Sequence, residues 1–315
     1  MAAEHVQTLD LSNFTGRIFF LADPYAHYSA LCHLITSITT ENEDVVILAT
    51  GNLFDYGPEP MDLLTAIESN FFAGRRIQFY SATGAGEVML MKLLPENPDR
   101  RKFYPSTYEN DRWSSHGGLW HKSVNRFYLE ELISKLMATQ LPLMLRADLP
   151  GSIRIGFCSS DYCSVRKSFP DTYNALKSFN KSNINSYRGQ FIFGMDHAMT
   201  PQLIDGVNLM ILGRNPVNSI RKVHDKPLSN QPLLVGNCLH INTGSLDFLT
   251  TTRLSNLAPG ITKEHHPALT LVEYRSSSDH KLVLHQLTNR YPGIFNIRTS
   301  TFDLYSIDNH VMDLL

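Results

Sequence analysis

Charged residues are scarce in this chain, and neither sign dominates. Asp, Glu, Lys and Arg make up 18% of the 315 residues, and the formal net charge is −2. This excludes long charged disordered tails and any general electrostatic attraction to nucleic acid or anionic membranes. No apolar run reaches the roughly 18 residues of a membrane span. Residues 1–14 have neither the basic nor the apolar segment of a signal peptide. We expect a cytoplasmic protein without membrane insertion or nucleic-acid binding.

Cysteine is also rare, and its spacing is not that of a metal or redox motif. The chain has 4 cysteines, and none of them form a C-x-x-C pair: Cys32, Cys158, Cys163 and Cys238. In a chain of this size, scattered thiols are more often reduced core residues than a disulfide framework. The cysteines therefore favour a reducing compartment.

Apolar runs alternate with helical patterns in the first half of the chain. Strands are predicted at 16–22, 45–49 and 77–82, each followed by a loop and then a helix, at 28–38, 61–67 and 88–94. Repeated strand–loop–helix units favour a largely parallel sheet. A helix at 124–137 and a strand pair at 143–147 and 153–157 follow. The second half has closely spaced short strands, which favour a second, antiparallel sheet, at 209–212, 233–235, 239–242, 269–274 and 282–286.

Polar loops follow these strands, where ligands bind in α/β sheets. The chain has Ala22-Asp23-Pro24-Tyr25-Ala26, Gly51-Asn52-Leu53-Phe54-Asp55-Tyr56-Gly57-Pro58, Gly84-Ala85-Gly86-Glu87, His116-Gly117-Gly118-Leu119-Trp120, Leu141-Pro142-Leu143, Ser159-Ser160-Asp161-Tyr162-Cys163, Gly213-Arg214-Asn215-Pro216-Val217 and Ile241-Asn242-Thr243-Gly244. In order and spacing these blocks resemble G-D-x-H-G, G-D-x-x-D-R-G-P, G-N-H-E, N-G-G-x-W, L-P-L, H-A-D-Y-P, G-H-T-P-V and I-D-T-G of calcineurin-like metallophosphoesterases, especially the compact bacterial and phage-type serine/threonine phosphatases.

The resemblance covers about residues 16–290 and implies an α/β fold. Two mixed β-sheets would pack face to face with flanking helices outside them. The implied organisation is a calcineurin-like phosphatase domain at 1–290 and a C-terminal extension at 291–315.

The departures from the family pattern fall on the metal ligands. The resemblance implies two divalent metals, held by carboxylate, imidazole and amide groups, and a metal-bound hydroxide that attacks the phosphoryl group. Asp23 is retained, but the other ligand positions have changed to Tyr25, Asn52, Ala85, Ser159 and Arg214. The neutral phenol of Tyr25 is a poor metal ligand, and Ala85 has no donor atom. The neutral amide of Asn52 cannot offset the charge of two dications as a bridging carboxylate does.

Further positions of the implied site have changed, whereas the turns between them have not. Gly86 stands in place of a general-acid histidine, and Tyr56 in place of a phosphate-clamping arginine; the second such arginine falls near Met195. Asp55, which would pair with that histidine, is expected to cap its loop. Turn residues of the same loops are retained: Gly51, Gly57, Pro58, Gly84, Glu87, Gly213, Pro216 and Gly244. Loss at the metal-ligand and catalytic positions beside intact turns indicates a retained fold without the metal reaction.

Arg214 has a specific expected role in place of a metal. A permanently protonated guanidinium could neutralise Asp23 as the dication would. We therefore expect Arg214 within hydrogen-bonding distance of Asp23 or Asn52; a surface cation is the alternative.

The sequence predicts a catalytically inactive phosphatase homologue, a pseudoenzyme, with no metal and no cofactor. It would bind a protein partner as a scaffold or regulatory subunit. One alternative is a phosphate or phosphoprotein reader that uses Arg214. The other is an active phosphoesterase with a rearranged site, for which weak candidate ligands are His27, His197, His240, the pair His265 and His266, and the thiols Cys158 and Cys163.

The segment 291–315 is too apolar for a solvated disordered tail. It either packs against the sheets or helices of the protein itself and completes the core, or docks in part into a partner. Its apolar residues fit neither a strand nor a helix period cleanly.

Overall fold

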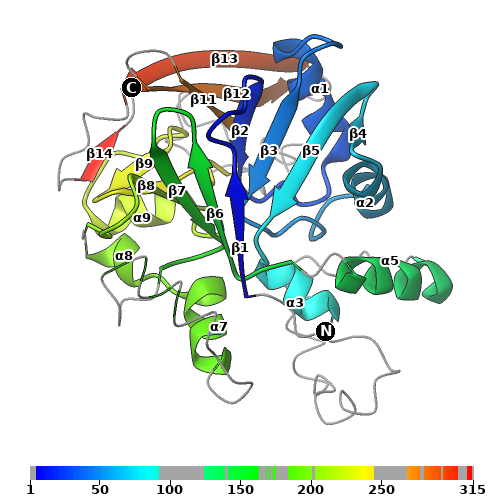
Figure 1. The fold of residues 1–315 in the computed structure, drawn as a ribbon, viewed down its shortest axis with the longest axis horizontal. Coiled ribbons are helices and arrows are strands. Elements are labelled where there is room, and N and C mark those ends of the chain that lie inside the picture. Colours follow the sequence, from blue (N-terminus) through cyan, green and yellow to red (C-terminus); the bar gives the residue numbers. More distant parts are fainter. Residues whose placement is uncertain are drawn as a thin grey trace.

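The strands of the protein form two mixed sheets (Figure 1). A computed structural model describes residues 5–91, 124–138, 141–162, 168, 170, 172, 174, 184–200, 203–244, 268–276, 280–291, 294–303 and 311–313. The block His116–Trp120, Cys163 and the pair His265 and His266 lie outside these residues.

Each sheet has seven strands, and both contain parallel and antiparallel pairs. The first sheet has the order β1 (Val6–Asp10), β6 (Met144–Leu149), β7 (Ile153–Cys158), β8 (Leu209–Leu212), β10 (Cys238–His240), β9 (Leu233–Val235) and β14 (Val311–Asp313). The second has the order β13 (Ile294–Asp303), β12 (Lys281–Tyr291), β11 (Ala268–Arg275), β2 (Arg17–Leu21), β3 (Val45–Ala49), β5 (Arg75–Ser81) and β4 (Phe71–Phe72).

The two sheets pack face to face, and helices cover their outer faces. Phe20 of β2 meets Phe157 of β7 edge to face, with 5.2 Å between ring centroids. All of β3 is buried because Val46 and Leu48 face the other sheet, whereas Ile47 faces the helices. The fold class predicted from the sequence is confirmed.

The helices pack on the outer face of one sheet or the other. The cluster on the second sheet includes Leu31 of α1 and Leu63 of α2, and the cluster on the first sheet includes Phe191 of α7. The described helices are α1 (Tyr28–Ile38), α2 (Pro60–Ser69), α3 (Ala85–Met91), α5 (Arg126–Ala138), α7 (Ile184–Phe193), α8 (Asp196–Met199) and α9 (Val217–Val223). Among the described residues, none of these helices is long and apolar enough to cross a membrane.

The expected division into a parallel first-half sheet and an antiparallel second-half sheet is wrong. β8, β9 and β10 join β6 and β7 in the first sheet, and β8 is parallel to β7. β11 instead returns beside β2, antiparallel to it, and so extends the sheet of β2, β3 and β5. Spacing along the chain indicates that strands exist, but the edge that a returning strand joins depends on long-range packing.

The C-terminal segment contributes strands to both sheets. β12 continues to Tyr291, past the boundary expected at 290, and β13 pairs with it antiparallel. β14 pairs with β9 in the other sheet. The backbone at 294–303 and 311–313 therefore belongs to the protein's own sheets, while the division into a domain and an extension stays a prediction.

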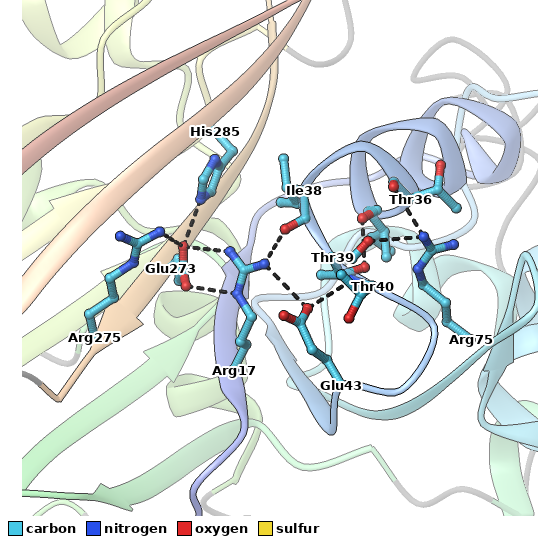
Figure 2. A network of polar contacts seen from close by, with 11 residues as sticks. Arg17, Thr36, Ile38, Thr39, Thr40, Glu43, Arg75, Glu273, Arg275 and His285 are labelled. Atoms are coloured by element: carbon cyan, nitrogen blue, oxygen red, sulfur yellow. Dashed lines mark hydrogen bonds and ion pairs between the residues drawn. The ribbon is translucent and has the colours of Figure 1, made fainter.

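A buried carboxylate, Glu273, joins three strands of the second sheet where α1 ends (Figure 2). It accepts hydrogen bonds from Arg17 Nε at 2.9 Å and Arg17 Nη2 at 2.8 Å, and from Arg275 and His285 Nε2. Arg17 also donates to the Ile38 carbonyl at the end of α1. Burial opposes ionisation, but the donors, His285 foremost, hold the pKa of Glu273 well below its usual range.

Replacing Glu273 by Gln should lower the free energy of unfolding by about 2–3 kcal/mol, since a charged acceptor is lost beside Arg17. Because the pKa of Glu273 is lowered on folding, its carboxylate contributes fully to the free energy of unfolding above the unfolded pKa of 4.5. This contribution is lost progressively as pH falls below that value. Urea unfolding at pH 7 measures the difference. A matched control is Glu41→Gln on the exposed loop after α1; an equal loss in both variants would contradict the assigned role.

Candidate functional site

Loops from both sheets meet at the carboxyl ends of the strands. Asp23 follows β2 and Asn52 follows β3 in the second sheet, whereas Ser159 follows β7 and Asn242 follows β10 in the first. Asn52 Nδ2 lies 3.0 Å from Asp23 Oδ1 and 3.4 Å from Ser159 Oγ. Asn242 Nδ2 lies 2.7 Å from Asp23 Oδ2. The two halves of the chain thus converge on one carboxylate.

Three side-chain donors surround Asp23, which is fully buried. Besides the two amides, the Tyr25 hydroxyl donates to Asp23 Oδ2 at 3.1 Å. We call Asp23, Tyr25, Asn52 and Asn242 the Asp23 cluster. Burial raises the pKa of Asp23 to about 7, although the bonds from Asn52 and Tyr25 oppose this. Charge on this carboxylate is therefore costly even with its donors in place.

Backbone groups fix both amides with their N–H groups toward Asp23. Asn52 Oδ1 accepts from the Gly86 backbone N–H at 3.2 Å. Asn242 Oδ1 accepts from the Gly244 N–H, and its Nδ2 also donates to the Arg214 carbonyl. If either amide were flipped, its oxygen would face the Asp23 carboxylate and its N–H group would face the backbone N–H that it now accepts from. The inward-facing groups are thus hydrogen-bond donors.

The backbone of these loops is strained at residues that are not glycine. Positive φ occurs at Asp23 (44°), Tyr25 (46°), Ala26 (55°), Asn52 (53°) and Tyr56 (64°). Such conformations cost most for residues other than Asn and Asp, and they persist where the surrounding structure enforces them. The loop geometry is therefore maintained by its surroundings rather than by local preference.

Glu87 holds two of these loops together. Its buried carboxylate accepts backbone N–H bonds from Asn52 at 2.9 Å, Leu53 at 2.6 Å and Gly84 at 2.7 Å. Burial raises the pKa of Glu87, and these backbone donors oppose the rise. Gly84 is needed because a side chain there would overlap Asn52. Glu87 thus positions the loop that carries Asn52.

Asp55 and Tyr56 lie beside the Asp23 cluster. A Cβ on Gly86 would overlap the Asp55 carboxylate, so Asp55 occupies the space next to this glycine. The ring of Tyr56 packs edge to face on Tyr25, with 5.2 Å between centroids. Burial, together with the charge of Asp55, raises the pKa of Tyr56 to about 12, and Arg214 opposes this shift. Ala85, at the start of α3, has no donor side chain.

The prediction that Arg214 forms a hydrogen bond with Asp23 or Asn52 is wrong. The guanidinium lies 4.7 Å from the centroid of the Phe193 ring, and its Nη1 donates to the Ile192 carbonyl at 3.4 Å. Its charge still lowers the pKa of Asp23 from a distance. The reason is that Asn52, Asn242 and Tyr25 already occupy both carboxylate oxygens. The phosphate-reader role of Arg214 stays a prediction.

Asn242 was missed by the sequence analysis as a partner of Asp23. The signal was present, because Asn242 stands where the I-D-T-G block has its aspartate. Its importance became visible once β10 placed it 2.7 Å from Asp23.

The donors at this site do not fit a pair of divalent metals. Asp23 is the single carboxylate of the Asp23 cluster, and both of its oxygens accept hydrogen bonds. Over the described part of the chain, no group of three or more His, Cys, Asp or Glu could hold a metal ion. His27 is buried with its Nε2 atom unpartnered, and burial lowers its pKa to about 3. His240 is buried on β10, and His197 lies on α8.

No family model matches the sequence, and no curated protein matches it. Similar solved structures include a metallophosphoesterase from Sphaerobacter thermophilus, 13% identical with a TM-score of 0.38, covering 87% of this chain and 89% of that one. A Saccharomyces cerevisiae serine/threonine phosphatase with similarity to human phosphatase PP5 is 10% identical, TM-score 0.45, coverage 95% and 84%. A cold-active protein-tyrosine phosphatase of Shewanella is 11% identical, TM-score 0.46, coverage 93% and 82%. Likeness at this level carries no conclusion about activity.

Proposed function

We propose that this protein is a non-catalytic relative of the calcineurin-like phosphatases that acts by binding a protein partner in the cytoplasm. The observation that carries the proposal is the hydrogen bonding of Asp23, the one family ligand retained. Its oxygens accept from Asn52, Asn242 and Tyr25. Amide N–H groups repel a cation, so the cluster replaces metal coordination by hydrogen bonds.

Retention of the loop geometry supports a role that needs the fold but not the reaction. Glu87 still binds three backbone N–H groups, and Gly57 still lies against the Tyr25 carbonyl, where a side chain would overlap. Strained, well-packed loops whose inward groups are hydrogen-bond donors rather than metal ligands are suited to recognition rather than hydrolysis.

The purified protein is expected to bind no stoichiometric Mn²⁺ and to hydrolyse p-nitrophenyl phosphate no faster than buffer with Mn²⁺. Without a metal there is neither an activated nucleophile nor a Lewis acid for the phosphoryl oxygens. Calorimetric titration with Mn²⁺ and a release assay measure both quantities. Hydrolysis that disappears in Asp23→Ala would instead show an active, rearranged site.

A matched variant tests whether the amides exclude the metal. Asn52→Asp places a second carboxylate beside Asp23 and removes one inward N–H group. We expect this variant to bind Mn²⁺ more tightly than the wild type. Equal, weak binding by both would mean that the amide of Asn52 is not the cause of exclusion.

A further inference from the structure

β5, the last strand but one of the second sheet, is largely unpaired on the side away from β3. β4 pairs only with Arg75 and Arg76 at the start of β5, and the Ile77 N–H donates to the Asn70 carbonyl. From there β5 continues to Ser81 beside β3 alone. Figure 1 shows β4 covering one end of β5.

The backbone groups of β5 beyond its pairing with β4 can be assigned to one side or the other. In the parallel pairing of β3 and β5, Ala49 is opposite Ser81, and the Ala82 N–H donates to the Ala49 carbonyl. Because backbone groups alternate along a strand, the N–H groups of Phe79 and Ser81 face away from β3. Within the described chain, these outward N–H groups have no hydrogen-bond partner.

A groove of about 1020 Å³ runs along this edge. Its lining is apolar at Leu64 and Ile67 of α2 and at Phe79, which share one core cluster, and polar at Gln7 of β1 and Gln78. Phe79 and Gln78 are neighbours in β5 and so face opposite sides, which we call the apolar and the polar wall. An ion pair between Glu68 of α2 and Lys135 of α5, with 3.2 Å between Oε2 and Nζ, also lines the groove. We call this feature the β5 groove.

We propose that the β5 groove binds an extended peptide segment of a partner protein, which adds to β5 as a further strand. An extended backbone supplies alternating carbonyl and N–H groups that match the outward groups of Phe79 and Ser81. The helices α2 and α5 contribute Ile67, Glu68 and Lys135 to the lining, and helices beside a strand edge hinder its pairing with the edge of another sheet. The inference rests on the proposed protein-binding function.

The walls of the groove define the sequence of this peptide. Side chains of an extended strand alternate between faces, so those toward Leu64, Ile67 and Phe79 should be apolar and those toward Gln7 and Gln78 polar. Arg76 is exposed at the end of the groove, which favours a carboxylate at the matching end of the peptide.

The test starts from a phage-displayed library of random heptapeptides selected on the full-length protein. Synthetic copies of the selected peptides are then titrated against wild type, Ser81→Pro and Ser81→Ala. Proline removes the outward N–H of residue 81 without removing a bond to β3, and alanine keeps that N–H. We expect alternating apolar peptides whose affinity falls about tenfold in Ser81→Pro and stays near wild type in Ser81→Ala.

Amide exchange of the wild type gives a second, independent measurement should Ser81→Pro fold poorly. Bound peptide should slow solvent exchange of the Phe79 and Ser81 N–H groups. Peptides that leave both groups unprotected, or a library that yields no binder, would overturn the proposal. The Mn²⁺ and hydrolysis experiments report on the Asp23 cluster alone, so failure of the proposed function is distinguishable from failure of the groove.

Discussion

Replacing His27 by Gln is expected to make the protein more resistant to mild acid. His27 is buried at the start of α1, where the helix N-terminus also disfavours a positive charge. Burial lowers its pKa from 6.5 to about 3. Between these values the unfolded chain holds a proton that the folded chain does not, so the free energy of unfolding falls as pH falls.

The expected size of the His27 effect follows from that window. The wild type should lose about 2 kcal/mol relative to His27→Gln between pH 7.5 and pH 5, and roughly 5 kcal/mol over the full window. Urea unfolding of both proteins at several pH values measures the difference, in which the other titrating groups cancel. His33→Gln, at an exposed position of α1, is the matched control. A difference that is constant with pH would show that folding does not lower the pKa of His27.

Replacing Asp23 by Asn is expected to have the opposite pH dependence. Burial raises the pKa of Asp23 from 3.8 to about 7. Between these pKa values the folded chain holds a proton that the unfolded chain has lost. The contribution of Asp23 to the free energy of unfolding is therefore complete below pH 3.8 and declines as pH rises to about 7. Relative to Asp23→Asn, the wild type should lose roughly 4 kcal/mol across this window, with no further change above it.

The Asp23 prediction is checked by how the difference in free energy of unfolding between wild type and Asp23→Asn changes with pH. The size of that difference at one pH is not informative, since the variant also rearranges hydrogen bonds with Asn52 and Asn242. A ¹³C titration of the carboxyl with a midpoint near neutral pH would agree with it. A midpoint near the ordinary value, together with a flat stability difference, would contradict it. The contributions of His27 and Asp23 to the pH dependence of the free energy of unfolding have opposite signs, so they largely cancel in the wild type between about pH 4 and pH 6.5.

The local elements and the order of the loops follow from contiguous stretches of the sequence. α1 at Tyr28–Ile38, β3 at Val45–Ala49 and β8 at Leu209–Leu212 lie where the apolar patterns predicted them. Periodicity decides these elements because each is set by contiguous residues facing one environment. That Ala85 has no donor side chain is likewise visible from residue identity alone.

The hydrogen-bond and strand partners of those residues are set by long-range packing. Asn242 and Asp23 are 219 positions apart, and no local pattern indicates that the amide rather than Arg214 reaches the carboxylate. The same holds for β11, which returned beside β2 instead of forming a separate sheet, and for β13 and β14, whose segment fitted no clean period. Strand pairing and side-chain contacts across such separations depend on the packing of the whole core, which no single segment of the sequence specifies.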